Sequence, residues 1–311
     1  MINTASQLSS ALTVCTPLLV GEIVYLDYPV YDNVGDLLIW HGTIQFLKQQ
    51  KKKVTAYYST RNISNRMHNH INRCFTICLQ GGGNLGDLWP WFQEFREEII
   101  QAYPNKRIVI FPQSVHFNSQ KALEKACTTF KNHPDLHIFL RDKNSYAILE
   151  AQGVSNIQLC PDMAHALWGK VVAEPKRINS PLYLLRRDKE DNNLPPEVAT
   201  HKPTAFDWDD LLTGWLRIGY KIGIKMHTID HRFDGRLPTS FYWRIISWAM
   251  IKRAIHIVSI HDGVVTNRLH AMLLSALLSR NVTAYDNSYG KLSSYFDLWL
   301  KDIPTIDFRK T

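Results

Sequence analysis

The chain has 311 residues, of which 45% are hydrophobic, 21% charged and 11% aromatic. These fractions are typical of globular proteins and exclude collagen-like, disordered and coiled-coil chains. A single core seldom grows beyond about 250–300 residues, so the length favours two domains. The formal net charge is +8, which indicates an anionic partner. Residues 1–175 have a net charge of +2 and residues 176–311 one of +6, so the excess lies mainly in the second half.

The cysteines and the apolar segments bear on where the protein resides. The five cysteines (15, 74, 78, 127 and 160) are odd in number and irregularly spaced, with no CxxC pair and no metal-knuckle spacing. We therefore expect reduced thiols in a reducing compartment. The N-terminal segment lacks the basic residues of a signal peptide, and no apolar stretch approaches the roughly 20 residues of a membrane span. These features predict a soluble, cytoplasmic protein.

Short apolar runs alternate with helical patterns through the first half. The patterns predict strands at 23–26, 54–58, 75–79, 107–111, 137–140 and 157–160. They predict helices at 36–48, after the glycine run at 81–83, at 122–130 and at 144–152. This alternation is typical of a parallel, doubly wound sheet.

A polar segment with a proline at 173–177 predicts a linker, so we expect domains at 1–175 and 176–311. In the second half we expect strands at 182–185, 264–266 and 282–285. The expected helices lie at 209–218, 242–259 and 268–278, followed by a closing amphipathic helix. The predicted fold class is α/β, with two Rossmann-like domains facing each other across a cleft.

In open α/β sheets, ligands bind at the carboxyl ends of the strands, where five loops carry unusual residues. The first contains Asn33, Gly35 and Asp36; Gly35 could adopt a positive φ, and Asp36 either caps the next helix or serves the function. The second contains Gly82, Gly83 and Asn84. Its glycines would let a ligand approach the backbone, although the motif is neither a dinucleotide fingerprint nor a P-loop.

The other three loops are rich in polar and cationic side chains. Gln113 and Ser114 would suit sugar hydroxyls or form a simple turn. Arg186 and Arg187 form either a bidentate anion site or a surface ion pair with an aspartate. Arg268 and His270 stand where a strand becomes a helix, and the helix dipole there favours anions. We favour a functional role for that last pair.

Several short motifs occur in a characteristic order. They are 33–36 (NVGD), 81–83 (GGG), 112–114 (PQS), 141–142 (RD), 161–162 (PD), 186–187 (RR), 268–271 (RLHA) and 285–291 (YDNSYGK). With them the chain resembles the polysaccharide pyruvyl transferase family from about residue 25 to residue 296. The resemblance implies a two-domain GT-B-like fold that transfers pyruvate from phosphoenolpyruvate (PEP) to a sugar as a ketal. It also implies that Arg268, His270 and either Arg186 or Arg187 hold PEP.

Residue roles follow from that chemistry. Protonated His270 would act as the general acid, and Asp36 or Asp87 would accept the hydroxyl proton. Arg268 and Lys291 would neutralise the leaving phosphate. Asn33, Gly82, Gly83, Asn84, Gln113 and Ser114 are the expected acceptor-side residues in domain 1–175. The scheme requires no metal and no cofactor besides the donor PEP. Similar sequences commonly have Asp where this chain has Asn267, so this chain departs from the family pattern there and lacks the charged carboxylate.

Other functions remain open at this stage. A GT-B glycosyltransferase would use its basic second domain to hold a nucleotide sugar. A nucleic-acid binder is disfavoured, because no recognised binding motif is present. The aromatic and basic segment with Phe241, Trp243, Arg244, Trp248 and Lys252 could rest on a membrane or could be a core helix with one wet end. Membrane contact at the inner face of the cytoplasmic membrane would suit a lipid-linked oligosaccharide acceptor.

Overall fold

The computed structural model describes residues 4–187, 194–286 and 290–310, which contain two parallel β-sheets. The larger sheet has the order β2-β1-β3-β5-β6-β7, with β4 paired to β5 outside this path. The smaller sheet has the order β11-β10-β9-β8. The predicted α/β class is therefore confirmed. The strands are β1 (Ile23–Leu26), β2 (Val54–Tyr58), β3 (Thr76–Leu79), β4 (Gly82–Gly86), β5 (Arg107–His116), β6 (Leu136–Leu140), β7 (Ile157–Leu159), β8 (Leu182–Leu184), β9 (Gly263–Thr266), β10 (Asn281–Tyr285) and β11 (Ile306–Arg309).

Both faces of the larger sheet are buried, as side-chain alternation along β1 shows. Ile23 and Tyr25 join one core cluster, and Val24 and Leu26 join another. The first cluster includes residues of α2 (Val34–Gln49). The second includes residues of α3 (Asn65–Arg73), α4 (Pro90–Ala102), α5 (Gln120–Asn132) and α6 (Lys143–Ala151). The strand order reverses between β1 and β3, so the loops that follow these strands diverge and leave a crevice.

The smaller sheet is wound in one direction only. Its spatial order follows the chain, so right-handed crossovers bring the connecting helices to one face. That face packs against α9 (Thr239–Ile260), α10 (Leu269–Leu277) and α11 (Lys291–Tyr295). The opposite face is covered by the segment around α7 (Pro196–Ala199), through Leu185, Val198, Ala205 and Tyr285.

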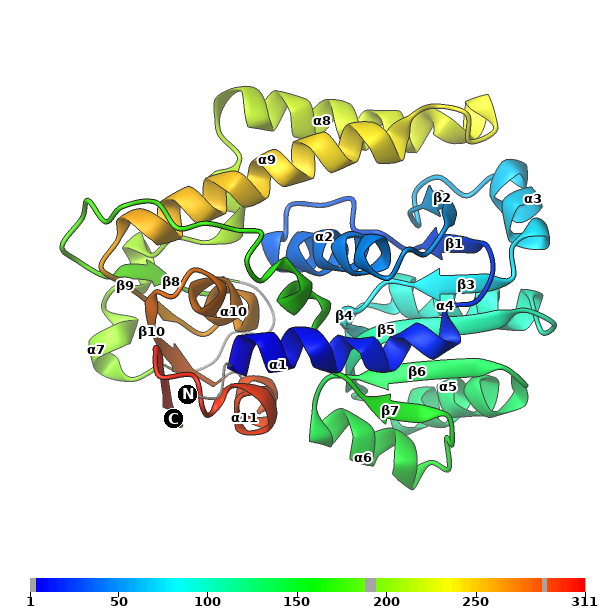
Figure 1. Cartoon of the computed structure of the whole chain (residues 1–311), viewed down its shortest axis with the longest axis horizontal. Helices are drawn as coiled ribbons and strands as arrows, with labels where there is room; N and C mark the ends of the chain where they lie inside the picture. The colour runs from blue at the N-terminus through cyan, green and yellow to red at the C-terminus, as the bar shows by residue number, and fades with distance from the viewer. Residues whose placement is uncertain (1–3, 188–193, 287–289, 311) are drawn as a thin grey trace.

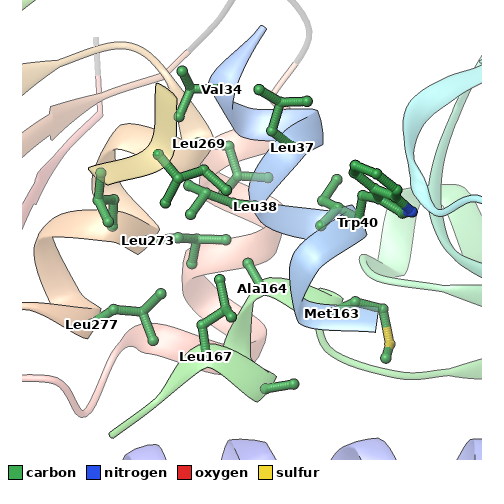
Figure 2. Close-up of a cluster of buried hydrophobic side chains, with 14 of the residues drawn as sticks. Val34, Leu37, Leu38, Trp40, Met163, Ala164, Leu167, Leu269, Leu273 and Leu277 are labelled. Carbon is green, nitrogen blue, oxygen red and sulfur yellow. The ribbon is translucent and has the colours of Figure 1, made fainter. Parts of the chain in front are cut away.

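A layer of helices joins the two sheets. Figure 1 shows α2 and α10 between the sheets, with α8 (Gly214–Ile229) and α9 above them. In Figure 2, Leu38 of α2, Leu273 of α10 and Leu167 of the short helix η2 (Met163–Leu167) lie in one apolar cluster. Gly42 permits this approach, because an added Cβ would lie 2.1 Å from the Met163 carbonyl oxygen. The N-terminal helix α1 (Thr4–Ala11) contributes Leu8 to the same core.

Several predicted boundaries are wrong. Residues 112–114 are not a turn, because β5 continues through Pro112 to His116. The pairing of β5 with β6 shifts register between Ile110 and Gln113, an irregularity of the kind that accommodates a proline. Much of the expected glycine loop is strand β4. The helix expected at 209–218 is a short 3-10 turn, η4 (Trp208–Leu211), followed by α8. Helix α1, the turn η1 (Leu12–Leu18) and β11 were not predicted.

The expected linker at 173–177 has no regular secondary structure. One cluster of buried side chains nevertheless includes residues from both sides of it, such as Leu38 and Leu273. The division into domains 1–175 and 176–311 therefore stays a prediction. Across the described ranges, no helix is both long enough and apolar enough to cross a bilayer.

The close approach of α2 to η2 leads to a stability prediction. We expect Gly42→Ala to lower the free energy of unfolding by about 3 kcal/mol, because the methyl group must displace backbone atoms of Met163. In the control Gly153→Ala, the added methyl group has no atom within 4 Å, and the only cost is the positive φ of 73°. We expect this variant to lose about 1 kcal/mol in the free energy of unfolding. Urea unfolding of both variants measures the difference. Equal losses in the two variants would show that the helix contact is not tight.

Candidate active site

A cavity of about 440 Å³ opens at the carboxyl ends of both sheets. This is the size of a small-molecule site. One wall comes from the loops after β1 and β6, from strand β4 and from the start of α4. The other comes from the segment after β8, from the loop after β9 and from the first turn of α10. The lining residues are Tyr31, Asp32, Asn33, Asp36, Gly83, Asn84, Trp89, Phe92, Arg141, Arg186, Arg187, Asp207, Trp208, Asp209, Arg268, Leu269 and His270. The N-termini of α2, α4 and α10 all meet the cavity, so three helix dipoles favour an anion there.

The first turn of α2 lies against His270. Asn33 caps this helix by accepting a hydrogen bond from the Gly35 N–H at 3.0 Å, so Asp36 is not the cap. Gly35 is helical and has no positive φ, contrary to expectation. Glycine is required here because it has no side chain: a Cβ at position 35 would lie 2.5 Å from Nδ1 of His270. The sequence around Gly35 therefore fixes the position of the imidazole ring.

Asp36 enters the cavity beside a glycine that makes room for it. A Cβ on Gly82 would lie 3.3 Å from Oδ1 of Asp36, and the φ of Gly82 is 140°, a conformation that side chains rarely adopt. Gly82 itself does not line the cavity, whereas Gly83 and Asn84 do. The glycine run thus serves to admit a neighbouring carboxylate.

A buried carboxylate links the two walls. Oδ2 of Asp162 accepts hydrogen bonds from Nη1 of Arg141 at 2.5 Å and Nε2 of His270 at 3.2 Å. Its Oδ1 accepts from the backbone N–H of Ala164 at 2.9 Å. Burial would raise the pKa of Asp162, but the adjacent His270 and Arg141 outweigh burial and hold that pKa well below the usual range. Asp162 is therefore an ionised acceptor for hydrogen bonds from Arg141 and His270.

A second histidine, His165, lies near Asp162 and supports its backbone. Burial lowers the pKa of His165 to about 4, so this side chain is neutral near pH 7. Its Nε2 lies 2.8 Å from the hydroxyl oxygen of Tyr295, and that oxygen accepts a bond from the backbone N–H of Asp162. Tyr295 can then donate to His165. The pair holds the backbone of Asp162 in place without competing for its carboxylate.

The arginines of the opposite wall are oriented by aspartates. Nη2 of Arg268 donates to Oδ2 of Asp207 at 2.6 Å, and Nε lies within ion-pair distance of Oδ1, at 2.6 Å. Arg187 donates through Nη2 to Asp209 and Asp210 at its more exposed end. These pairs hold the guanidinium planes at the ends of β8 and β9.

Asn267 orients the same wall through the backbone. Its side chain is fully buried, and its Oδ1 accepts the N–H of Arg186 at 2.8 Å. An amide oxygen makes this bond as a carboxylate would. Asn at this position therefore preserves the hydrogen bond that ties β8 to β9, while it removes a negative charge beside the arginines.

A second buried network positions Asn84. Nη2 of Arg96 donates to Oδ2 of Asp27 at 2.7 Å and to Oδ1 of Asn84 at 2.6 Å. Nε2 of Gln113 also donates to that Asn84 oxygen, at 3.3 Å. With Oδ1 held by two donors, the amide NH₂ of Asn84 is the group that can face a ligand. Asp27 itself has a φ of 66° at the end of β1 and is fully buried.

Aromatic side chains make up much of the remaining lining. Tyr31 and Phe92 meet edge to face with ring centroids 5.8 Å apart, and Trp89 and Trp208 also line the cavity. Asp32 lies among them. Burial, together with Asp209 and Asp207, raises the pKa of Asp32 above its ordinary value. Aromatic faces and carboxylate oxygens are the groups that commonly bind the apolar faces and hydroxyls of sugars.

The structure brings eight of the predicted site residues together in this cavity. They are Asn33, Asp36, Gly83, Asn84, Arg186, Arg187, Arg268 and His270. Four others lie behind or outside it. Gln113 supports Asn84, Ser114 accepts a bond from Nε of Arg141 at 2.9 Å, and Gly82 makes room for Asp36. The prediction for Asp87 as a base finds no support, because its carboxylate accepts the N–H groups of Asn118 and Ser119 at the start of α5.

Lys291 stands at the first position of α11, but its side chain lies outside the described part of the structure, as do residues 287–289 of the predicted motif. Sequence reasoning gave no role to Arg141, Asp162, Asp207, Trp89 or Phe92. The Arg-Asp and Pro-Asp pairs at 141–142 and 161–162 were visible at strand ends. They could have been assigned only by knowing that Asp162 meets His270, which lies 108 residues away in the chain.

The charged side chains that line the cavity are balanced in number. Four arginines line it (Arg141, Arg186, Arg187 and Arg268), but so do four aspartates (Asp32, Asp36, Asp207 and Asp209). The excess charge of the second half is therefore not concentrated in this cavity. Across residues 4–187, 194–286 and 290–310, no group of three His, Cys, Asp or Glu side chains converges to hold a metal ion.

Comparison with known proteins identifies the family. Residues 33–289 match the family model described as "Polysaccharide pyruvyl transferase". EpsO of Bacillus subtilis (strain 168), provisionally named a pyruvyl transferase, is 37% identical over 306 residues, covering 98% of this chain and 93% of EpsO. Pyruvyl transferase 1 of Schizosaccharomyces pombe is 26% identical over 295 residues, covering 90% of this chain and 70% of that protein. The chain belongs to the polysaccharide pyruvyl transferase family and is an enzyme of that family.

A solved structure supports the fold. The crystal structure of a functionally uncharacterised protein from Klebsiella pneumoniae superposes on the whole chain with a TM-score of 0.63 at 18% identity, and all of that chain is covered. At this identity the likeness concerns the fold alone. The family match favours pyruvyl transfer over the nucleotide-sugar glycosyltransferase that the sequence had left open.

The buried Asp27 leads to a pH prediction. Burial raises the pKa of Asp27 to about 7, although Arg96 opposes this rise. An aspartate in the unfolded chain titrates near pH 4, so the folded protein binds the extra proton between about pH 4 and pH 7 and loses stability as the pH rises through this window. Asp27→Asn cannot titrate at this position. We therefore expect its free energy of unfolding, relative to that of wild type, to increase as the pH is raised from about pH 5 to about pH 8.

Urea unfolding at the two pH values measures the effect. The surface variant Asp302→Asn serves as the control and should keep a constant difference from wild type. If the difference between wild type and Asp27→Asn is the same at both pH values, Asp27 does not hold a proton in this range.

Proposed function

We propose that the protein transfers pyruvate from PEP to two hydroxyls of one sugar, within a polysaccharide or lipid-linked oligosaccharide precursor. The product is a ketal, and phosphate is released. The observation that carries the proposal is the junction of Arg268, His270 and the ionised Asp162 at the N-terminus of α10, in a chain of the pyruvyl transferase family. Arginine forks and a helix N-terminus suit a donor with a carboxylate and a phosphate.

The donor would lie against the wall formed by Arg186 and Arg268. Asp207 keeps the Arg268 guanidinium in one plane, and Arg141 adds a third cation from the end of β6. Because Arg268 is already paired with Asp207, donor binding would replace bonds from this arginine to Asp207 with bonds to the donor. A preorganised site of this kind stabilises developing negative charge on the leaving phosphate.

The reaction begins with the transfer of a proton from the protonated imidazole of His270 to the methylene carbon of PEP. The carbon that bears the phosphate becomes cation-like, and a sugar hydroxyl oxygen bonds to it while Asp36 accepts the hydroxyl proton. The bond to the phosphate oxygen then breaks, and phosphate leaves with the electron pair of that bond and takes up the proton held by Asp36, which regenerates the base. The second hydroxyl oxygen closes the ring and returns a proton to His270. Asp162 stabilises the imidazolium at the start of the cycle.

The acceptor sugar would occupy the wall of the larger sheet. Asp36 and the amide NH₂ of Asn84 would bind hydroxyls, and the rings of Trp89 and Phe92 would cover an apolar face of the sugar. Asp36 is preferred to Asp87 as the base because only Asp36 lines the cavity. This assignment keeps the acceptor side in domain 1–175 and the donor side in domain 176–311. Two Rossmann-like domains facing a cleft in the GT-B manner would provide such walls.

The cellular setting belongs to the same proposal. All five cysteines are buried free thiols. That arrangement suits a reducing compartment such as the cytoplasm, where we place the enzyme, and where PEP is available as the donor.

The roles of Arg268 and His270 are tested by kinetics. We expect His270→Ala to lower PEP-dependent phosphate release with a glycan acceptor by about 100-fold or more, because the general acid is lost. Arg268→Ala should raise the PEP concentration for half-maximal rate by about tenfold or more, because a charge-assisted fork is lost. The exposed cation variant Arg73→Ala should match wild type.

Ligand-induced shifts in melting temperature complete the test. PEP should stabilise the wild type, and UDP- or GDP-sugars should not. Stabilisation by nucleotide sugars but not by PEP would replace this proposal with a glycosyltransferase. Unchanged phosphate release in both variants would reject the site assignment.

The contact between Gly35 and His270 gives an independent test. A methyl group in Gly35→Ala must push the imidazole ring away from its position at Asp162, since the added atom would lie 2.5 Å from Nδ1. We expect a loss of about tenfold to 100-fold in the rate of phosphate release with a smaller change in PEP affinity. The control Gly169→Ala has open space around its added atom and should lose stability without losing rate. A wild-type rate in Gly35→Ala would show that the ring position is not critical.

A further inference from the structure

The antiparallel pair α8–α9, with the turn between them, has an unusual composition. Residues 214–260, here called the helical hairpin, contain eight Lys or Arg and two Asp, a net charge of +6. This equals the whole excess of the second half of the chain. All eight cationic residues are exposed, whereas Asp230 is fully buried and Asp234 is half-buried. The cations are Arg217, Lys221, Lys225, Arg232, Arg236, Arg244, Lys252 and Arg253.

Large apolar side chains are exposed on the same hairpin. Six of them are 47–65% exposed, and they are Trp215, Ile218, Ile222, Phe233, Phe241 and Ile245. Those on α8 recur at intervals of three and four residues, and the two on α9 are four apart, so each helix carries an apolar stripe. Exposed apolar residues gathered on one element mark an interaction surface rather than ordinary surface scatter.

The inner sides of the hairpin are fully occupied, which directs both stripes outward. Gly219 and Gly223 let α8 lie close on α9, because an added Cβ at either position would lie 2.7 Å from Ile246 or Trp243. Trp243 donates through Nε1 to the carbonyl oxygen of Pro29 at 2.6 Å. His227 of α8 meets the Tyr28 hydroxyl at 2.8 Å. By helical geometry, the stripes lie on flanks turned away from these contacts. Figure 1 shows α8 and α9 at the outer edge of the molecule.

We propose that the outer face of the hairpin docks on an anionic membrane surface, with both helices lying in the plane of the interface. Membrane-surface helices combine aromatic and aliphatic side chains with Lys and Arg and few acidic residues. Anionic lipid attracts each surface cation by about 1 kcal/mol. A second copy of this chain is the poorer occupant, because two faces of this positive charge would repel each other. The sequence offered two interpretations of the segment around Trp243, a membrane-resting helix and a core helix. Helix α9 has a buried face and an exposed face, so one helix can serve both roles.

The helical hairpin begins next to the cavity. This places the docking surface near the proposed active site, and the choice of a lipid-linked acceptor rests on the proposed function. Trp208 and Asp209 belong to η4 and line the cavity. Only Leu212 and Thr213 separate the end of η4 from the first residue of α8. A membrane under the hairpin would therefore lie near the cavity mouth. An acceptor held in the bilayer by its lipid would be confined to the layer where the cavity opens.

Vesicle flotation of the full chain, without substrates, tests the docking. Wild type should float with phosphatidylglycerol-containing vesicles, float less at high salt, and not float with pure phosphatidylcholine. The variants Trp215→Ser/Ile218→Ser/Phe241→Ser and Lys221→Glu/Lys225→Glu should each bind about tenfold more weakly. Matched controls are Trp91→Ser, which is 62% exposed on α4, and Lys121→Glu/Lys131→Glu on α5, and both should bind as wild type does.

The alternatives are separable in the same preparations. Failure of wild type to float, or equal flotation of wild type and hairpin variants, overturns the proposal. A wild-type dimer in gel filtration that the triple variant makes monomeric assigns the face to self-association and also overturns it. Phosphate release with a water-soluble acceptor should be unchanged in the hairpin variants. Activity without flotation rejects only the docking, and flotation without PEP-dependent activity rejects only the proposed function.

Discussion

The site depends on one buried carboxylate. Asp162 has no exposed surface, and it binds Arg141 from the larger sheet and His270 from the loop after β9 of the smaller one. A buried carboxylate held by a guanidinium and an imidazole is stable only when both donors remain in place, since the loss of a partner leaves its charge poorly compensated. The relative position of the two sheets at the cavity is therefore tied to the electrostatics of a single residue. Ser114 and Tyr295 extend this network on either side.

Small residues make the same arrangement sterically possible. Gly42 brings α2 onto η2, Gly35 brings it onto His270, and Gly82 admits the carboxylate of Asp36. None of the three is explained by helix or strand propensity, because glycine disfavours both. Each instead removes a side chain where a backbone segment or a reacting group must approach closely. The glycines, the buried carboxylate and the three helix N-termini together make a site that is organised before any ligand arrives.

Local pattern predicts the elements well, because strand-helix alternation leaves a clear periodicity. Loops with Asn33, Asp36, Arg268 and His270 were recognisable, since parallel strands deliver their following residues to one edge. Gln113 lies behind the cavity because β5 continues through Pro112 and carries this side chain to Asn84. Asp87 lies outside the cavity lining, where its carboxylate accepts the N–H groups of Asn118 and Ser119. Asp162 could not be found from sequence, since its importance lies in contacts with residues distant in the chain. Helix α1 and β11 were missed because their patterns are short and weak.

Net charge is the property that the structure reinterprets most. By sequence, the excess positive charge lies mainly in residues 176–311, whose net charge is +6. In the folded protein, four aspartates balance the four arginines of the cavity, and residues 214–260 carry a charge equal to the entire excess. The balanced cavity gains its preference for an anion from orientation, through guanidinium forks and helix dipoles at short range. The unbalanced hairpin acts at longer range, within a screening length of about 8 Å at physiological salt. Net charge and anion binding are thus properties of two different surfaces of this chain.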